Sequence, residues 1–167
     1  LGDTYNLSIG QGDLLITPLQ GAVATSAIAN GGTIYKPRIV GKSIKNAPNQ
    51  NPDIREFQPQ IIKENFVSEE SVRIAKQTMK ATVEDGSARS LQELPVSSGG
   101  KTGTAQFANN TKTHAWFTAF APYDEPEIAL AVIVEGGGGG QEVAAPVARD
   151  ILKWYFENKE QEEKEEK

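Results

Sequence analysis

The sequence contains no cysteine and only one histidine, His114. Without cysteine the chain can form no disulfide, hold no metal through thiolates and use no thiol as a nucleophile. A single histidine also excludes a metal site built from several imidazoles. These absences leave both cytosolic and exported proteins open, because neither class requires cysteine.

Long apolar runs and an excess of basic residues are also lacking. No segment approaches the ~18 consecutive apolar residues that indicate a membrane-spanning helix. The net charge of −5 argues against a nucleic-acid-binding protein, which needs a basic surface. The first residues do not resemble a signal peptide, and the only methionine is Met79. We therefore expect Leu1 to be an internal position of a longer protein.

The composition indicates one globular domain. The chain has 167 residues and 38% of them are hydrophobic, which is enough for one core and too few residues for two ordinary domains. Thr17-Pro18 predicts the start of a helix that ends at Asn30 before Gly31-Gly32. Thr33 to Val40 reads as an extended segment, and the proline-rich residues Asn46 to Pro59 as a surface loop or hairpin.

The second half predicts a helix, three strands and a last helix. Ser68 starts the helix, which places Val72, Ala75, Met79 and Val83 on one face. The expected strands cover residues 97–107, 114–121 and 127–135 and are antiparallel neighbours. The apolar run Ile128 to Val134 favours a strand covered on both faces.

The last helix is expected from Glu142 to Asn158. Its apolar stripe consists of Val143, Val147, Ile151, Leu152 and Tyr155. Residues 160–167 are charged or glutamine and are expected to form a frayed tail.

The most informative stretch is Gly99-Gly100-Lys101-Thr102-Gly103-Thr104-Ala105-Gln106, which contains K-T-G. It places a lysine, two hydroxyls and unhindered backbone N–H groups within a few residues, a donor set suited to a carboxylate or an oxyanion. Gly100-Lys101-Thr102 also matches the end of a nucleotide-binding P-loop, but Pro95 stands where that motif needs glycine. For K-T-G alone, a glycine-rich strand with an exposed lysine is the default interpretation.

Further segments give the motif its context. They are Ser8-Ile9-Gly10-Gln11-Gly12, Thr17-Pro18-Leu19-Gln20, Ala29-Asn30-Gly31-Gly32, His114-Ala115-Trp116-Phe117, and the five glycines that lead to Ala144-Ala145-Pro146-Val147-Ala148. In this order they resemble the C-terminal half of the transpeptidase domain of class B, elongation-type penicillin-binding proteins 2. The resemblance omits residues 41–65 and the charged tail.

The resemblance implies a fold. It is an α+β fold, the C-terminal part of a serine β-lactamase/transpeptidase-like domain, with an antiparallel sheet packed against helices. Residues 1–158 would be part of that domain and residues 159–167 its tail. No metal and no organic cofactor is implied.

The resemblance also implies site residues. The catalytic candidates are Lys101, which would bring positive charge near the catalytic hydroxyls, and Thr104, whose N–H would form half of an oxyanion hole. The hydroxyls of Thr102 and Thr104 would bind the terminal carboxylate of a D-alanyl-D-alanine peptide or a β-lactam. Gly103 would leave room for the substrate, and Gln106 would border the cleft.

The nucleophile of this family is not found. It is the serine of an S-x-x-K motif, assisted by an S-x-N motif, and no S-x-N triplet occurs in this sequence. Ser98-Gly99-Gly100-Lys101 matches S-x-x-K formally, but two glycines argue against the required helical turn. We expect both motifs to lie before Leu1, so that this chain alone is inactive.

The parent function implied is D,D-transpeptidation in peptidoglycan synthesis, at the outer side of the cytoplasmic membrane. Expected partners are stem peptides, β-lactams, the upstream half of the domain, cell-wall elongation proteins and a second copy of the chain, held through exposed apolar surface. No nucleic acid is expected. The alternatives are a non-catalytic β-lactam or muropeptide sensor of the same fold and, less favoured, a β-lactamase.

Two smaller features have competing interpretations. His114 is either a general base or, as we favour, a structural residue at the head of a strand. The five glycines from Gly136 to Gly140 suit a loop with close backbone approach better than a phosphate site, since no lysine or hydroxyl residue follows them.

Overall fold

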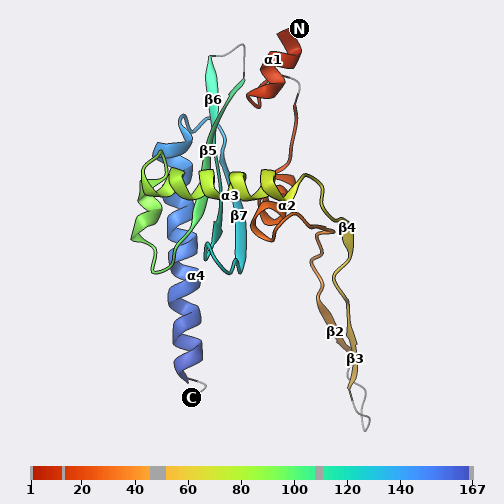
Figure 1. Cartoon of the computed structure of the whole chain (residues 1–167). Helices are drawn as coiled ribbons and strands as arrows, with labels where there is room; N and C mark the ends of the chain where they lie inside the picture. The colour runs from red at the N-terminus through yellow and green to blue at the C-terminus, as the bar shows by residue number, and fades with distance from the viewer. Residues whose placement is uncertain (1, 13, 46–51, 108–110, 166–167) are drawn as a thin grey trace.

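The computed structural model describes residues 2–12, 14–45, 52–107 and 111–165 (Figure 1). The elements are α1 (Gly2–Ser8), α2 (Pro18–Ala29), β1 (Ile34–Tyr35), β2 (Lys42–Lys45), β3 (Asp53–Glu56), β4 (Ile61–Lys63), α3 (Glu69–Glu84), η1 (Arg89–Glu93), β5 (Gly99–Phe107), β6 (Lys112–Ala121), β7 (Ile128–Val134), η2 (Gly140–Ala144) and α4 (Ala145–Glu165).

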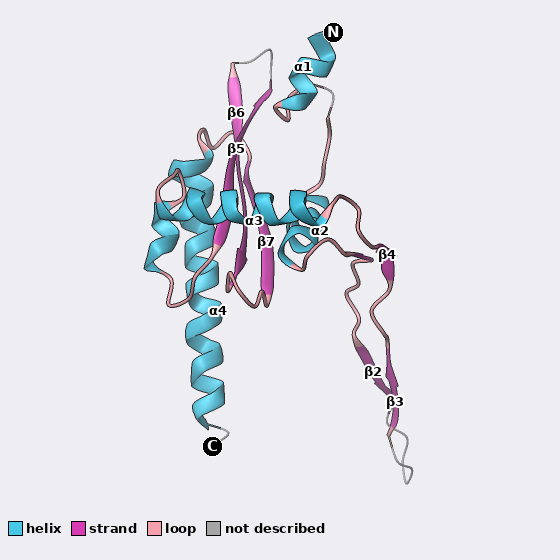
Figure 2. Cartoon of the chain, viewed as in Figure 1, coloured by secondary structure: helices cyan, strands magenta, loops and turns pink. Residues whose placement is uncertain are grey.

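The central sheet is an antiparallel meander in the order β5-β6-β7 (Figure 2). Its register is regular, with Thr102 opposite Phe117 and Phe117 opposite Val132. The three expected strands are therefore confirmed, and so are the α+β class and the antiparallel sheet packed against helices.

Helices pack on both faces of the sheet, because β6 is apolar on both sides. On one face Phe117 is fully buried with Leu152 of α4. On the other face Phe120 is fully buried and packs with Met79 of α3 and Ala29 of α2. Burying each of these large side chains stabilises the fold by ~1.5–3 kcal/mol. The sheet is thus fixed as a rigid layer between α4 and the α2–α3 pair.

Helix α2 begins and ends as the sequence predicts. Thr17 accepts a hydrogen bond from Gln20 N–H, and the Gln20 side chain accepts one from Thr17 N–H in return, which is a capping box. At the other end Gly31 and Gly32 have positive φ angles, and Gly32 N–H donates to Ala27 O at 2.7 Å. Glycine adopts this left-handed conformation readily, so the chain turns sharply there.

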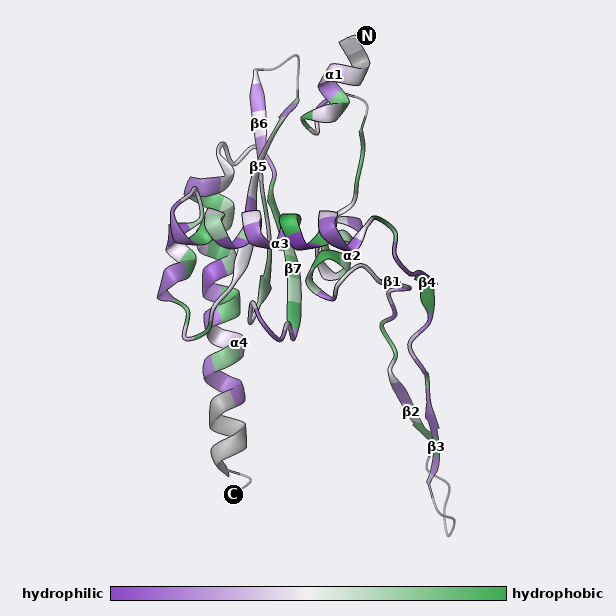
Figure 3. Cartoon of the chain, in the orientation of Figure 1, coloured by the Kyte–Doolittle hydropathy of each residue, from purple (hydrophilic) through white to green (hydrophobic). Residues whose placement is uncertain are grey.

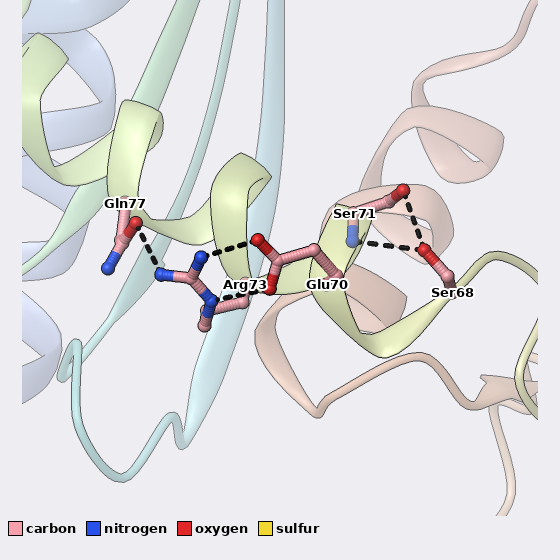
Figure 4. A network of polar contacts seen from close by, with 5 residues as sticks. All are labelled: Ser68, Glu70, Ser71, Arg73 and Gln77. Carbon is pink, nitrogen blue, oxygen red and sulfur yellow. Dashed lines mark hydrogen bonds and ion pairs between the residues drawn. The ribbon is translucent and has the colours of Figure 1, made fainter.

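Helix α3 begins with a polar network at its N-terminus (Figure 4). Ser68 is the N-cap and accepts from Ser71 N–H at 3.2 Å. Arg73 donates to both carboxylate oxygens of Glu70, at 2.9 and 2.6 Å, and to the Gln77 side chain at 3.0 Å. The hydrogen bond from Arg73 lowers the pKa of the Glu70 carboxyl, and the same contact raises the pKa of Arg73. On the predicted face of α3, Val72, Met79 and Val83 are buried and Ala75 is half-buried.

The segment before α3 extends away from the sheet (Figure 1). β2 pairs with β3 as an exposed hairpin whose first strand precedes the expected range, and residues 46–51 of that range lie outside the described part. Only Ile34 and Tyr35 of the extended segment form a strand, and they pair with β4, which the sequence did not predict. Helix α1 was also missed, because its residues show no apolar periodicity.

Helix α4 differs from its expectation in two ways. A short turn of π-helix, η2, precedes it, and α4 continues past Asn158 to Glu165, where a frayed tail was expected. Glutamate, lysine and glutamine are good helix formers, which explains the extension. The domain boundary at residue 158 stays a prediction.

The buried face of α4 was also predicted wrongly in part. Leu152 is buried, but Val147 and Ile151 are 41% and 44% exposed. The face that contacts the sheet consists of Ala145, Ala148, Leu152 and Phe156. Small alanines let the helix approach the strands closely, whereas the predicted stripe consisted of the larger apolar residues.

Strand β7 is covered by helices on both faces but forms an edge of the described sheet. It is apolar along its length (Figure 3), yet every one of its residues is only half-buried. Within the described residues it pairs with β6 alone, so its other edge is free. Ile128, Leu130, Val132 and Val134 pack on the α4 side and Ala129 packs with Ala29 of α2 on the other, so the expected coverage of both faces is confirmed.

Candidate active site

The K-T-G segment lies in β5, which forms one edge of the central sheet. β5 pairs only with β6 within the described residues, and Lys101 stands opposite Thr118 in the register. Side chains alternate between the faces of a strand, so Thr102 and Thr104 share one face and Lys101 lies on the other. An edge strand carries unpaired N–H and C=O groups that can accept an extended peptide.

Two glycines let the sheet aromatics pack beneath the motif. A Cβ on Gly99 would lie 2.7 Å from the Phe120 ring, and one on Gly100 would lie 2.6 Å from the Phe117 ring. Neither position has room for a larger residue. The aromatic packing thereby fixes the start of β5 and the lysine that follows it.

The five-glycine segment ends against the same strand. A Cβ on Gly140 would lie 2.4 Å from Trp116 O and 2.5 Å from Gly103 O. Gly140 N–H also points at Thr104 Oγ1, at 3.4 Å. The expected close backbone approach is therefore found at Gly140, which packs against the backbone at Gly103 in the centre of the motif.

The predicted site residues line a common cavity of about 530 Å³. Lys101, Thr104 and Gln106 are exposed, while Thr102 and Gly103 are half-buried. Lys101 Nζ donates to Thr102 O at 2.5 Å, and Thr102 Oγ1 lies 2.8 Å from Ser87 Oγ. The structure thus brings all five residues to one cavity.

The opposite wall of the cavity comes from the segment between α1 and α2. The cavity-lining residues of this segment are Ile9, Gly10, Gln11, Gly12, Leu14, Leu15 and Ile16. Leu15 is 90% exposed, so this wall is apolar and open. A mostly apolar cavity with a few convergent polar groups is the usual form of a ligand site.

Sequence reasoning missed two contacts in this site. Gln11 contacts the backbone of Thr104 and Gln106, and Ser87 contacts the Thr102 hydroxyl. Gln11 lies between Gly10 and Gly12 in one of the segments that carry the family resemblance. That position could have marked Gln11 as a candidate site residue. Ser87 lies in a short connection with no motif of its own, so only the structure reveals it.

Two alternative sites are not supported. Ser98 is buried and Gly99 to Lys101 are extended, so the formal S-x-x-K does not form a helical turn. His114 stacks on Phe107 with ring centroids 3.9 Å apart, and its Nδ1 accepts from Gly136 N–H at 3.2 Å. Both contacts agree with a structural histidine. No group of three potential metal ligands occurs among the described residues.

Comparison with known proteins gives a consistent result. The family model "Penicillin binding protein transpeptidase domain" matches residues 2–153. The chain is 32% identical to the peptidoglycan D,D-transpeptidase MrdA of Haemophilus influenzae, over 93% of this chain and 26% of that protein. The imipenem acyl-enzyme complex of penicillin-binding protein A from M. tuberculosis has a TM-score of 0.77 and 32% identity, over 90% of this chain and 33% of that one.

A structure of penicillin-binding protein PBP2 with MreC, from Helicobacter pylori, matches with a TM-score of 0.73 and 29% identity, over 93% of this chain and 27% of that chain. The chain thus spans about a quarter to a third of the length of the relatives it matches. The resemblance that the sequence motifs indicated is confirmed. This chain belongs to the penicillin-binding protein transpeptidase domain family.

Proposed function

We propose that this chain is the K-T-G-bearing part of a peptidoglycan D,D-transpeptidase of the elongation type. The observation that carries the proposal is the edge strand β5, whose Lys101, Thr102 and Thr104 line one cavity in a chain of this family. The relatives named MrdA and PBP2 support the elongation type.

The reaction would proceed through an acyl-serine. A serine Oγ attacks the carbonyl of the penultimate D-alanine, the peptide C–N bond breaks, and D-alanine leaves with the proton. An amine of a neighbouring stem peptide then attacks the ester, the new amide forms and the serine oxygen regains its proton. A β-lactam acylates the same serine by opening its ring.

The residues of β5 would serve the first step. The contacts of Gln11 with Thr104 O and Gln106 N–H indicate that Thr102, Thr104 and Gln106 direct their backbone groups to the outer edge, since such groups alternate along a strand. The N–H of Thr104 would then stabilise the oxyanion, and an oxyanion donor is worth roughly 3–4 kcal/mol. The hydroxyls of Thr102 and Thr104 would bind the substrate carboxylate. The positive charge of Lys101 would stabilise negative charge that develops near the catalytic hydroxyls.

The nucleophile would come from outside these 167 residues. The sequence has no S-x-N, and its formal S-x-x-K lies in an extended segment. The edge of β7, unpaired within the described residues, and the exposed apolar side chains Leu14, Leu15 and Leu19 offer a surface for the rest of the domain or for a second copy.

The protein would act on the outer side of the cytoplasmic membrane, with stem peptides and β-lactams as ligands and elongation proteins as partners. The complex of a related PBP2 with MreC supports such partners. Among the described residues, none of the helices has the length and apolar character to cross a bilayer.

Fluorescent penicillin tests the proposal. The isolated chain is expected to take no covalent label, whereas the longer protein encoded by its gene is expected to label and to contain S-x-x-K and S-x-N before Leu1. Stable labelling of the isolated chain, or a gene without these motifs, would overturn the proposal. Reversible binding without label in the longer protein would favour the sensor instead.

A further inference from the structure

The side-chain amide of Gln11 lies along the outer edge of β5. Its Nε2 donates to Thr104 O at 3.0 Å, and its Oε1 accepts from Gln106 N–H at 3.2 Å. A carbonyl only accepts and an N–H only donates, so the two contacts fix which end of the amide faces which residue. One carboxamide therefore engages two successive outward-facing groups of the strand.

The end of α1 places Gln11 at this position. Gln11 N–H donates to Asn6 O and Gly10 N–H to Leu7 O, both at 2.9 Å, which is a Schellman motif. Gly10 and Gly12 have φ angles of 73° and 79°. Because the chain turns through left-handed glycines on both sides, Gln11 points away from α1 and toward β5.

The Gln11 amide reproduces the pairing of an added strand. In a parallel pair, one residue donates to the carbonyl of one residue and accepts from the N–H two positions further along. Thr104 O and Gln106 N–H have this spacing. A peptide that adds to an edge strand uses the same two groups.

We propose that Gln11 is a specificity-determining residue that ends the peptide-pairing edge of β5 at Thr104. This inference rests on the proposed function, in which a peptide ending in D-Ala-D-Ala lies along β5. Gln11 leaves the N–H groups of Thr102 and Thr104 to the ligand. A ligand that pairs as far as Gln106 must displace the amide, so only the last residues of the peptide are held in extended pairing.

Amide hydrogen exchange of the isolated chain tests the contact without any ligand. In Gln11→Met, which keeps the length but not the hydrogen bonds, exchange at Gln106 N–H is expected to rise about five- to tenfold. In Gln11→Glu the carboxylate still accepts from Gln106 but cannot donate to Thr104, so Gln106 stays protected. Gln58→Met, an exposed glutamine outside the site, is the matched control. Equal exchange at Gln106 in wild type and Gln11→Met would overturn the proposal.

Peptide binding tests whether Gln11 limits the number of peptide residues that pair with β5. The probes are an N-acetylated tripeptide and an N-acetylated pentapeptide, both ending in D-Ala-D-Ala, titrated by NMR. Gln11→Met is expected to bind the pentapeptide severalfold more tightly relative to the tripeptide than wild type does. An unchanged ratio would overturn the proposal even with the expected exchange result. Failure of every variant to bind either probe would count against the proposed function, while the Gln106 exchange still decides the Gln11 contact.

Discussion

The hydroxyl oxygens of Ser87 and Thr102 lie 2.8 Å apart. Ser87 belongs to the connection that follows α3, and Thr102 is the threonine of K-T-G. Because Thr102 is half-buried, this contact gives its hydroxyl a defined direction before any ligand arrives. The orientation of a proposed carboxylate-binding group therefore depends on a residue fifteen positions upstream.

Ser87→Ala is expected to lower the free energy of unfolding by about 1 kcal/mol, because the half-buried Thr102 hydroxyl loses its partner. Ser87→Thr keeps a hydroxyl and serves as the conservative control. Urea denaturation measures both. If Ser87→Ala is as stable as wild type, the contact does not contribute to stability.

Gly140→Ala is expected to destabilise the fold by roughly 1–3 kcal/mol or more, since the new Cβ would collide with Trp116 O and Gly103 O. The matched control is Gly41→Ala, where a Cβ meets nothing within 4 Å and is expected to change stability by less than about 0.5 kcal/mol. Thermal melting compares the two variants. Equal melting temperatures would contradict the close approach at Gly140.

Gly100→Ala is expected to cost roughly 1–3 kcal/mol, because its Cβ would lie 2.6 Å from the Phe117 ring. Combining it with Phe117→Leu tests the cause, since a smaller side chain relieves the collision. The double variant should be more stable than the sum of the single effects predicts. Strict additivity in chemical denaturation would show that the two positions do not collide.

The pair Glu70–Arg73 predicts a pH effect of defined sign. The hydrogen bond from Arg73 lowers the pKa of Glu70 in the folded state, so its contribution to stability is present above the unfolded pKa. It is lost as the pH falls through the lowered folded value. Arg73→Gln should return the Glu70 pKa to its ordinary range in a carboxyl NMR titration. The same Glu70 pKa in both proteins would contradict the pairing.

Local sequence signals were sufficient to predict the helices and strands that have clear capping residues or a clear apolar periodicity. Thr17-Pro18 and Ser68 predicted α2 and α3 to within a residue, and the strand pattern placed K-T-G on the first of three antiparallel strands. These signals act within a few residues, so the sequence alone reveals them.

The sequence-based predictions fail where contacts between residues far apart in the chain determine the structure. The face of α4 is set by alanines that fit the sheet closely, which hydropathy does not weight. β7 stays half-buried because it is an edge strand within the described residues, which its own sequence does not indicate. Gln11 reaches Thr104 across ninety-three positions, and no spacing rule connects the two. The family motif predicted which residues share the cavity, but not the contacts that orient them.

The acylation rate of the longer protein by fluorescent penicillin tests the central claim most directly, when measured for Lys101→Ala against wild type. The control is Lys112→Ala, an exposed lysine at the start of β6. If β5 forms the wall that binds and activates the ligand, Lys101→Ala should lower the second-order rate constant by about a hundredfold or more, with Lys112→Ala unchanged. Equal rates for Lys101→Ala and wild type would contradict the assignment of K-T-G to the active site.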